Sequence, residues 1–101
     1  MKFYHATPKE NTASILEKGL LKGFDGVVYL TKKPEESTRF LAIRFVNEVT
    51  VFEVDIPKQY KDKVMESFDH NENFFGCKAY MYLDDIPKEW VTLHSEYERK
   101  E

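Results

Sequence analysis

The stretch from Val49 to Ile56 constrains the fold most, because its side chains follow a period of two. Two sets alternate along it: Val49, Val51, Glu53 and Asp55 against Thr50, Phe52, Val54 and Ile56. This period places neighbouring side chains on opposite faces of a β-strand. Pro57 comes next and cannot donate to a strand ladder, so the sequence predicts a strand over 49–56 that ends at this proline.

Four shorter segments have the aromatic and β-branched content that favours strands. They cover residues 2–5, 27–30, 77–83 and 91–94. The segment 57–76 is polar, and we expect it to form a long, mobile connection that includes a short helix near 60–68. The charged segment 95–101 is expected to fray.

A strong helix start lies near the beginning of the chain. Thr7 offers an N-cap hydroxyl, Pro8 suits the first helical position, and Glu10 completes a capping box. Gly19 has the position of a left-handed C-cap. Together these residues predict a helix over 8–18.

A second helix is expected from Pro34, which two glutamates follow, to about position 47. Strands and helices alternate in the first half, and strands dominate the second, which is an α+β arrangement. A length of 101 residues, with 42% hydrophobic and 15% aromatic residues, suits one packed domain over residues 1–101.

Generic functional motifs do not match this sequence. The four glycines fit no phosphate-binding loop, and the three scattered histidines predict no metal site. A net charge of −3 does not indicate a nucleic-acid binder, although a local basic groove stays open. Cys77 is the lone cysteine, and signal-peptide or membrane-spanning segments are not evident, so we expect a cytoplasmic monomer without membrane contacts.

Several segments, taken in order, form a recognisable pattern. They are 3–7 (FYHAT), 13–20 (ASILEKGL), 28–31 (VYLT), 34–40 (PEESTRF), 51–57 and 79–91. The chain resembles, over nearly its whole length, the ADP-ribosyltransferase superfamily in its His-Tyr branch. This branch includes diphtheria-toxin-like and poly(ADP-ribose) polymerase-like enzymes and, more distantly, RNA 2′-phosphotransferases.

The resemblance implies a split β-sandwich with two or three short helices and a cleft that binds NAD as a substrate. His5 matches the histidine that hydrogen-bonds the adenosine ribose. The backbone of Ala6, where the family pattern has glycine, matches the position that grips the nicotinamide amide. Tyr29 matches the aromatic residue that stacks on nicotinamide, and Phe40 stands where a second aromatic wall is expected.

The resemblance also suggests contacts to the rest of the nucleotide and to the target. Thr7 and Thr31 are expected beside the nucleotide, and Arg39 is expected to meet its diphosphate. The family uses the loop before the last catalytic strand for target recognition. In this chain that loop contains Phe74 and Phe75, which would either stack on a base or anchor the loop.

The third catalytic position departs from the family pattern. Ala79 stands where a glutamate usually holds the 2′-hydroxyl of the nicotinamide ribose and supports the transition state. An apolar residue at this position occurs in some mono-ADP-ribosyltransferases and in RNA 2′-phosphotransferases. It also occurs in members that have lost activity.

Three functions therefore stay open. The first is ADP-ribose transfer from NAD to a protein or nucleic acid, in a toxin-like or phage-conflict role. The second is RNA 2′-phosphate transfer, although that group typically has histidine at the position of Tyr29. The third is a module that binds NAD or an ADP-ribose-like nucleotide without turnover. Each residue also has a structural interpretation: His5 as a strand-end histidine bonded to backbone, and Tyr29 and Phe40 as core aromatics.

Overall fold

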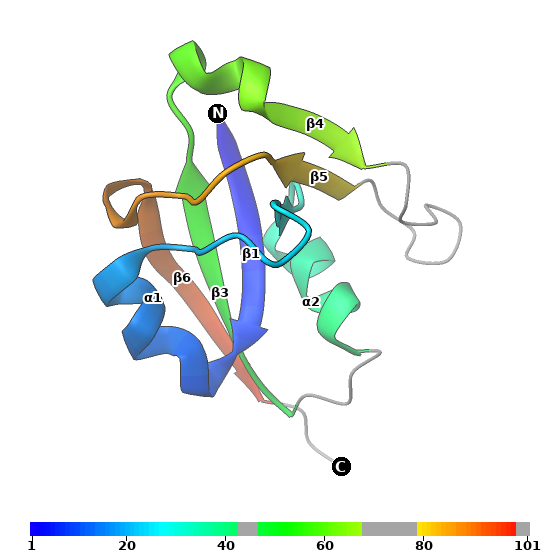
Figure 1. Cartoon of the computed structure of the whole chain (residues 1–101). Helices are drawn as coiled ribbons and strands as arrows, with labels where there is room; N and C mark the ends of the chain where they lie inside the picture. The colour runs from blue at the N-terminus through cyan, green and yellow to red at the C-terminus, as the bar shows by residue number, and fades with distance from the viewer. Residues whose placement is uncertain (43–46, 68–78, 99–101) are drawn as a thin grey trace.

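The computed structural model describes residues 1–42, 47–67 and 79–98, which contain two antiparallel sheets of three strands each (Figure 1). The first sheet has the order β1-β3-β6 and consists of β1 (Lys2–Pro8), β3 (Glu48–Asp55) and β6 (Val91–Glu98). The second has the order β2-β5-β4 and consists of β2 (Val28–Leu30), β5 (Ala79–Tyr82) and β4 (Val64–Ser67). The predicted α+β class is confirmed.

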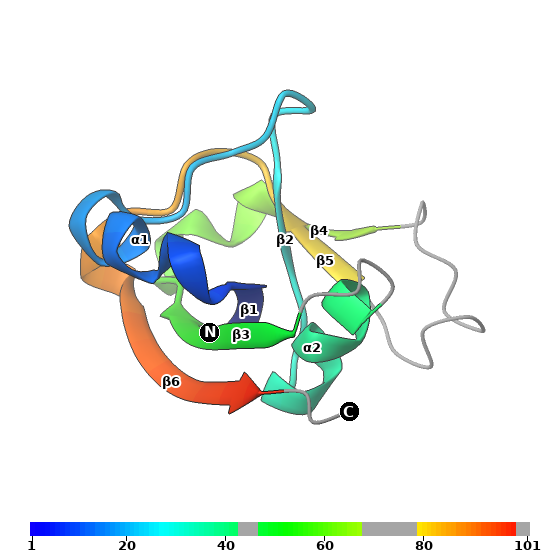
Figure 2. The ribbon, with the colours of Figure 1, turned by 90° about the horizontal axis from the view of Figure 1, so that it is seen from below.

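Helical segments surround the sheets. The α-helices are α1 (Thr12–Lys18) and α2 (Pro34–Ala42). Three short 3₁₀ turns accompany them: η1 (Lys9–Asn11), η2 (Lys58–Lys63) and η3 (Lys88–Trp90). Figure 2 shows α1 and α2 on different sides of the first sheet, with β1 and β3 between them.

The main hydrophobic core joins the inner faces of both sheets. Phe3 and Phe52 contribute from the first sheet, and Leu30 and Tyr82 contribute from the second; all four are almost completely buried. Ile15 of α1 packs against the same cluster. Burial of one such side chain stabilises a fold by about 1.5–3 kcal/mol. Burial of these side chains between the two sheets therefore holds the sheets together.

A smaller apolar cluster covers the opposite face of the first sheet. Val49 and Val51 of β3 are buried there, and Tyr4 and Ala6 of β1 pack against them. Helix α2 contacts both β1 and β3. Strand β3 is therefore buried on both faces, which makes it the centre of the fold.

The first helix begins later than the sequence predicts. Thr7 lies inside β1, paired with Thr50, so it is not an N-cap. Its hydroxyl oxygen instead accepts a hydrogen bond from the side-chain amide of Asn11 at 3.0 Å. The Thr7 cap prediction is wrong because β1 extends to Pro8 and uses the backbone of Thr7 for strand pairing. The end of the helix agrees with the prediction in that Gly19 has a positive φ of 82°.

Two further predictions need correction. The 3₁₀ helix η2 agrees in part with the helix expected near 60–68, but Val64–Ser67 form β4, because pairing with β5 overrides the local sequence. The remainder of the expected mobile connection, 68–76, lies outside the described residues. Strand β6 continues through Glu98, so residues 95–98 pair with β3 and do not fray, whereas the rest of the expected tail, 99–101, lies outside the described residues. The second helix begins at Pro34 as predicted, and its expected continuation over 43–46 lies outside the described residues.

Candidate functional site

The site begins where β1 and β2 touch. Tyr4 and Thr31 exchange two backbone hydrogen bonds, from Tyr4 N to Thr31 O at 2.8 Å and from Thr31 N to Tyr4 O at 2.9 Å. This pair is an isolated bridge between the two sheets. We call the facing edges of β1 and β2 next to this bridge the β1–β2 seam.

The backbone of Ala6 faces the seam. Alternate residues of a strand direct their N–H and C=O groups to the same edge of the strand. The backbone groups of Ala6 therefore face the β2 side, as those of Tyr4 do, and not β3. A ladder that continued from the Tyr4–Thr31 pair would join Ala6 to Tyr29. Within the described ranges, no bridge joins these two residues. The seam thus presents a backbone donor and a backbone acceptor.

His5 fills part of the same seam. Its Nδ1 lies 2.8 Å from the carbonyl oxygen of Tyr29, and because a carbonyl only accepts, Nδ1 is the donor. The two residues are 24 positions apart in the sequence. This bond fits the interpretation of His5 as a strand histidine bonded to backbone, and it also brings together the two residues that the sequence motifs single out.

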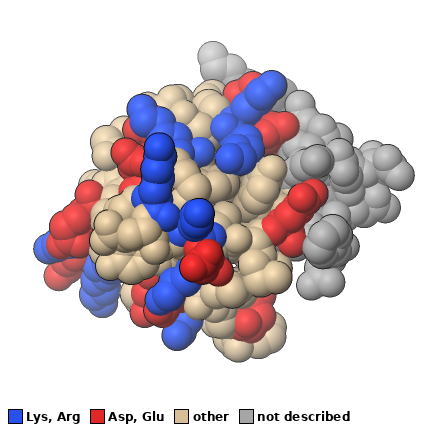
Figure 3. Space-filling model, turned by 90° about the horizontal axis from the view of Figure 1, so that it is seen from above, with Lys and Arg blue, Asp and Glu red and all other residues tan. Residues whose placement is uncertain are grey.

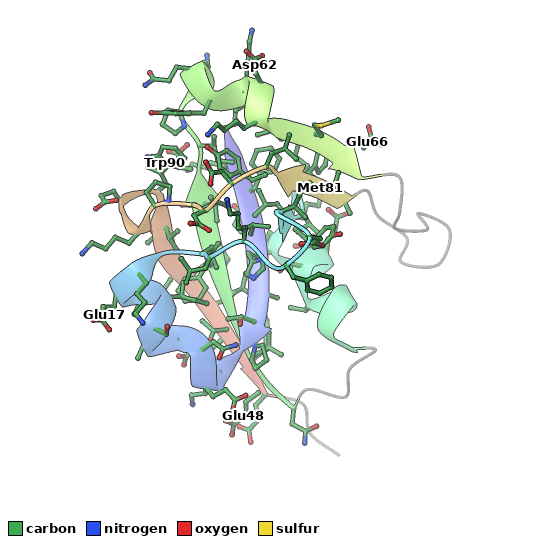
Figure 4. The ribbon with its side chains drawn as sticks, viewed as in Figure 1. Glu17, Glu48, Asp62, Glu66, Met81 and Trp90 are labelled. Carbon is green, nitrogen blue, oxygen red and sulfur yellow. The ribbon has the colours of Figure 1, made fainter. Side chains whose placement is uncertain are left out.

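The Tyr29 ring lies on the outer face of the second sheet. Tyr29 pairs with Met81, which pairs on its other side with Met65, so these three side chains share one face. Ala79, two residues before Met81, shares that face and is 3% exposed. Figure 4 labels Met81 on β5. The methyl group of Ala79 therefore lies on the same side as the Tyr29 ring.

Asp25 binds the hydroxyl end of Tyr29. The Tyr29 hydroxyl donates to Oδ2 of Asp25 at 3.1 Å, and the Val27 amide approaches Oδ1 at 3.4 Å. The loop is closed by a bond from Gly26 N to Gly23 O at 2.9 Å. Sequence reasoning missed Asp25. Its position four residues before Tyr29, in a glycine-flanked turn, was the available signal.

The other predicted site residues are spread more widely. Thr31 is buried, and its hydroxyl donates to Lys33 O at 3.0 Å, so its side chain is used in the turn that leads to α2. Thr7 is buried against Asn11. Arg39 and Phe40 belong to α2, the helix that contacts β1. Phe74 and Phe75 lie outside the described residues.

Charge around the molecule is mixed in sign. Figure 3 shows basic and acidic side chains interspersed on the face seen from above. A hollow of about 230 Å³ lies elsewhere, at the end of β3 that begins with Glu48, and is lined by Lys9, Glu48, Glu96, Tyr97 and Glu98. Three glutamates disfavour an anionic ligand there, so this hollow does not suit a nucleotide diphosphate.

No cluster of three potential metal ligands occurs among the described residues. In the same part of the chain, no helix has the length and apolar character needed to cross a membrane. No protein-family model matches the sequence, and no curated protein matches it either.

Proposed function

We propose that this protein binds NAD at the β1–β2 seam and transfers its ADP-ribose to a macromolecular acceptor with release of nicotinamide. The proposal combines the resemblance of the sequence motifs with the position of His5 and Ala6 on β1 next to Tyr29 on β2. Two small sheets that a single isolated bridge joins between β1 and β2 support the split-sandwich arrangement that the resemblance implies.

The observation that carries the proposal is the direction of the Ala6 backbone. Nicotinamide bears a carboxamide, which has an N–H donor and a C=O acceptor. The N–H and C=O of Ala6 face the seam and can bind both groups, as one strand binds another. The half-buried Tyr29 ring at the same seam offers a flat surface for the pyridine ring.

The chemistry follows from this binding mode. In the transfer, the bond between ribose C1′ and the nicotinamide nitrogen breaks, and nicotinamide leaves with the electron pair. A nucleophile of the acceptor then bonds to C1′ and loses its proton. In the proposed binding mode, Ala6 and Tyr29 hold the leaving group, and the His5 imidazole, which the Tyr29 carbonyl orients, binds a ribose hydroxyl.

Ala79 favours a second candidate function, a binding module that captures NAD or an ADP-ribose-like nucleotide without turnover. Its side chain is buried on the face that carries Tyr29, and a methyl group accepts no hydrogen bond. The stabilisation that a glutamate supplies to the developing positive charge is therefore missing from this position.

Binding is tested first, by calorimetry with NAD and with nicotinamide. Ala6→Pro removes the seam-facing N–H, and because that group does not bond to β3, the sheet should persist. We expect this variant to keep its circular dichroism spectrum and to lose at least about tenfold in affinity, the size of one hydrogen bond left unmade. Ala6→Ser keeps the amide and is the control. Equal affinity in both variants, or no binding to the unaltered protein, contradicts the proposal.

Turnover is tested with NAD labelled in the nicotinamide ring. The unaltered protein is mixed with candidate protein, RNA and DNA acceptors, and released nicotinamide is counted. Acceptor-dependent release supports transfer. Binding without release under every condition supports the binding module. Incorporation of RNA 2′-phosphate into the product would identify the phosphotransferase chemistry instead.

A further inference from the structure

We propose that Asp25 makes the seam selective for the cationic nicotinamide ring of NAD⁺ over the neutral ring of NADH. The inference rests on the proposed function, because it assumes that nicotinamide stacks on Tyr29. Asp25 lies outside the segments that carry the resemblance.

The geometry couples the carboxylate of Asp25 to the Tyr29 ring. Oδ2 accepts a hydrogen bond from the Tyr29 hydroxyl at 3.1 Å, and Oδ1 faces the Val27 amide at 3.4 Å. The carboxylate is thus held from both sides by the chain that leads into β2. The turn that carries it is closed by two backbone bonds, Gly23 N to Val27 O at 3.1 Å and Gly26 N to Gly23 O at 2.9 Å.

The physical effect has two parts. A phenol that donates to a carboxylate becomes richer in electrons, so its π face attracts a cation more strongly. The carboxylate also adds its own negative charge beside the stacked ring. Both parts act on the pyridinium of NAD⁺, which carries a positive charge, and neither favours the uncharged dihydropyridine of NADH.

Exposure sets the size of the effect. Asp25 is exposed to solvent, so water and salt screen its field. We expect a preference of about twofold to fivefold from this residue, which is the range of cation–π attraction at exposed sites. The same screening can be measured, because the preference for NAD⁺ over NADH should become smaller when salt is raised from about 0.05 M to about 1 M.

The test is the ratio of the dissociation constants for NADH and NAD⁺, measured by calorimetry. Asp25→Asn keeps the shape and a hydrogen-bond acceptor but removes the charge, and we expect the ratio to fall about twofold to fivefold. Asp62→Asn removes the same charge from an exposed residue of η2 and should leave the ratio unchanged. In a Tyr29→Phe background the Asp25→Asn change should have a smaller effect, because the hydroxyl that couples the two residues is gone.

The outcomes separate this inference from the function on which it rests. If the unaltered protein binds neither NAD⁺ nor NADH, the proposed function is wrong. If it binds NAD⁺ but the ratio is the same in Asp25→Asn, Asp62→Asn and the unaltered protein, the role of Asp25 is overturned. Should Asp25→Asn fail to fold, the salt series on the unaltered protein decides: a ratio that does not change with salt overturns the inference.

Discussion

The Lys63 ammonium group donates to Oδ2 of Asp84 at 3.0 Å and so joins the residue before β4 to the second residue after β5. The Leu83 amide reinforces this link by donating to Lys63 O at 2.9 Å. Lys22 approaches the other oxygen of Asp84 at 3.4 Å. Hydrogen bonds from Lys63, the Asp85 amide and Lys22 lower the pKa of Asp84 from 3.8 to about 2.

Stability should depend on pH through Asp84. Its pKa is lower in the folded protein than in the unfolded chain, so its contribution is present above about pH 4 and is lost as the pH falls toward 2. Asp84→Asn should lower the urea midpoint near neutral pH, and the gap to the unaltered protein should close in acid. Lys63→Met should reproduce part of this change. If the difference in urea midpoint between Asp84→Asn and the unaltered protein stays constant from neutral pH to acid, ionised Asp84 does not stabilise the fold.

Two glycines with similar φ angles should respond differently to alanine. Gly19 has φ 82° and Gly26 has φ 81°. A Cβ at Gly19 would collide with the carbonyl oxygen of Ile86, whereas nothing lies within 4 Å of a Cβ at Gly26. Gly26→Ala should cost about 1–2 kcal/mol, from the backbone conformation alone. Gly19→Ala should cost about 1–3 kcal/mol more, because of the collision. Equal losses in denaturant unfolding would refute this account.

A pair of hydroxyls, one fully buried and one half-buried, should contribute to stability as a unit. Thr12 Oγ1 and Thr50 Oγ1 are 2.7 Å apart, and Thr50 is fully buried. Thr50→Val should reduce the free energy of unfolding by about 1 kcal/mol. The double change Thr12→Val with Thr50→Val should cost less than the sum of the single changes, and Thr92→Val on the exposed part of β6 serves as the control. Strict additivity in a double-mutant cycle would mean that the hydroxyls do not interact.

Under the proposed function, introducing a carboxylate on the face that carries Tyr29 should increase catalysis. Ala79→Glu places an acceptor on the face that carries the Tyr29 ring, and a preorganised contact of this kind commonly changes a rate by about a hundredfold to a thousandfold. We expect faster release of nicotinamide from NAD without any acceptor. Ala79→Gln has nearly the same size and no charge, so it controls for the disturbance of a buried position. Similar rates in the two folded variants would place the catalytic group elsewhere.

The strands and the start of the second helix were largely predictable because their signals are local. The period of two around Phe52 identifies β3, and Pro34 with its acidic neighbours identifies the start of α2. Pro57 ends the strand segment as expected. In each case the residue types act through their own backbone preferences, which the sequence displays directly.

The errors arise where distant partners decide the structure. Thr7 has the pattern of a cap, yet it pairs with Thr50 and remains in β1. Val64–Ser67 is short and polar, yet β5 makes it a strand. Residues 95–98 are charged and were expected to fray, yet they pair with the edge of β3. These pairings cannot be read from neighbouring residues. The bond between Asp25 and Tyr29 is local, and the glycine-flanked turn was the signal for it.

The central place of β3 has a consequence for how the chain folds. Its two partners are β1, which begins at Lys2, and β6, which ends at Glu98, so the pairs Lys2–Asp55 and Glu48–Glu98 both span about half of the sequence. Closing such long loops is entropically costly before any contact forms. Refolding should therefore be slow compared with that of helical proteins of similar size. During synthesis, the first sheet cannot be completed until the ribosome has released β6.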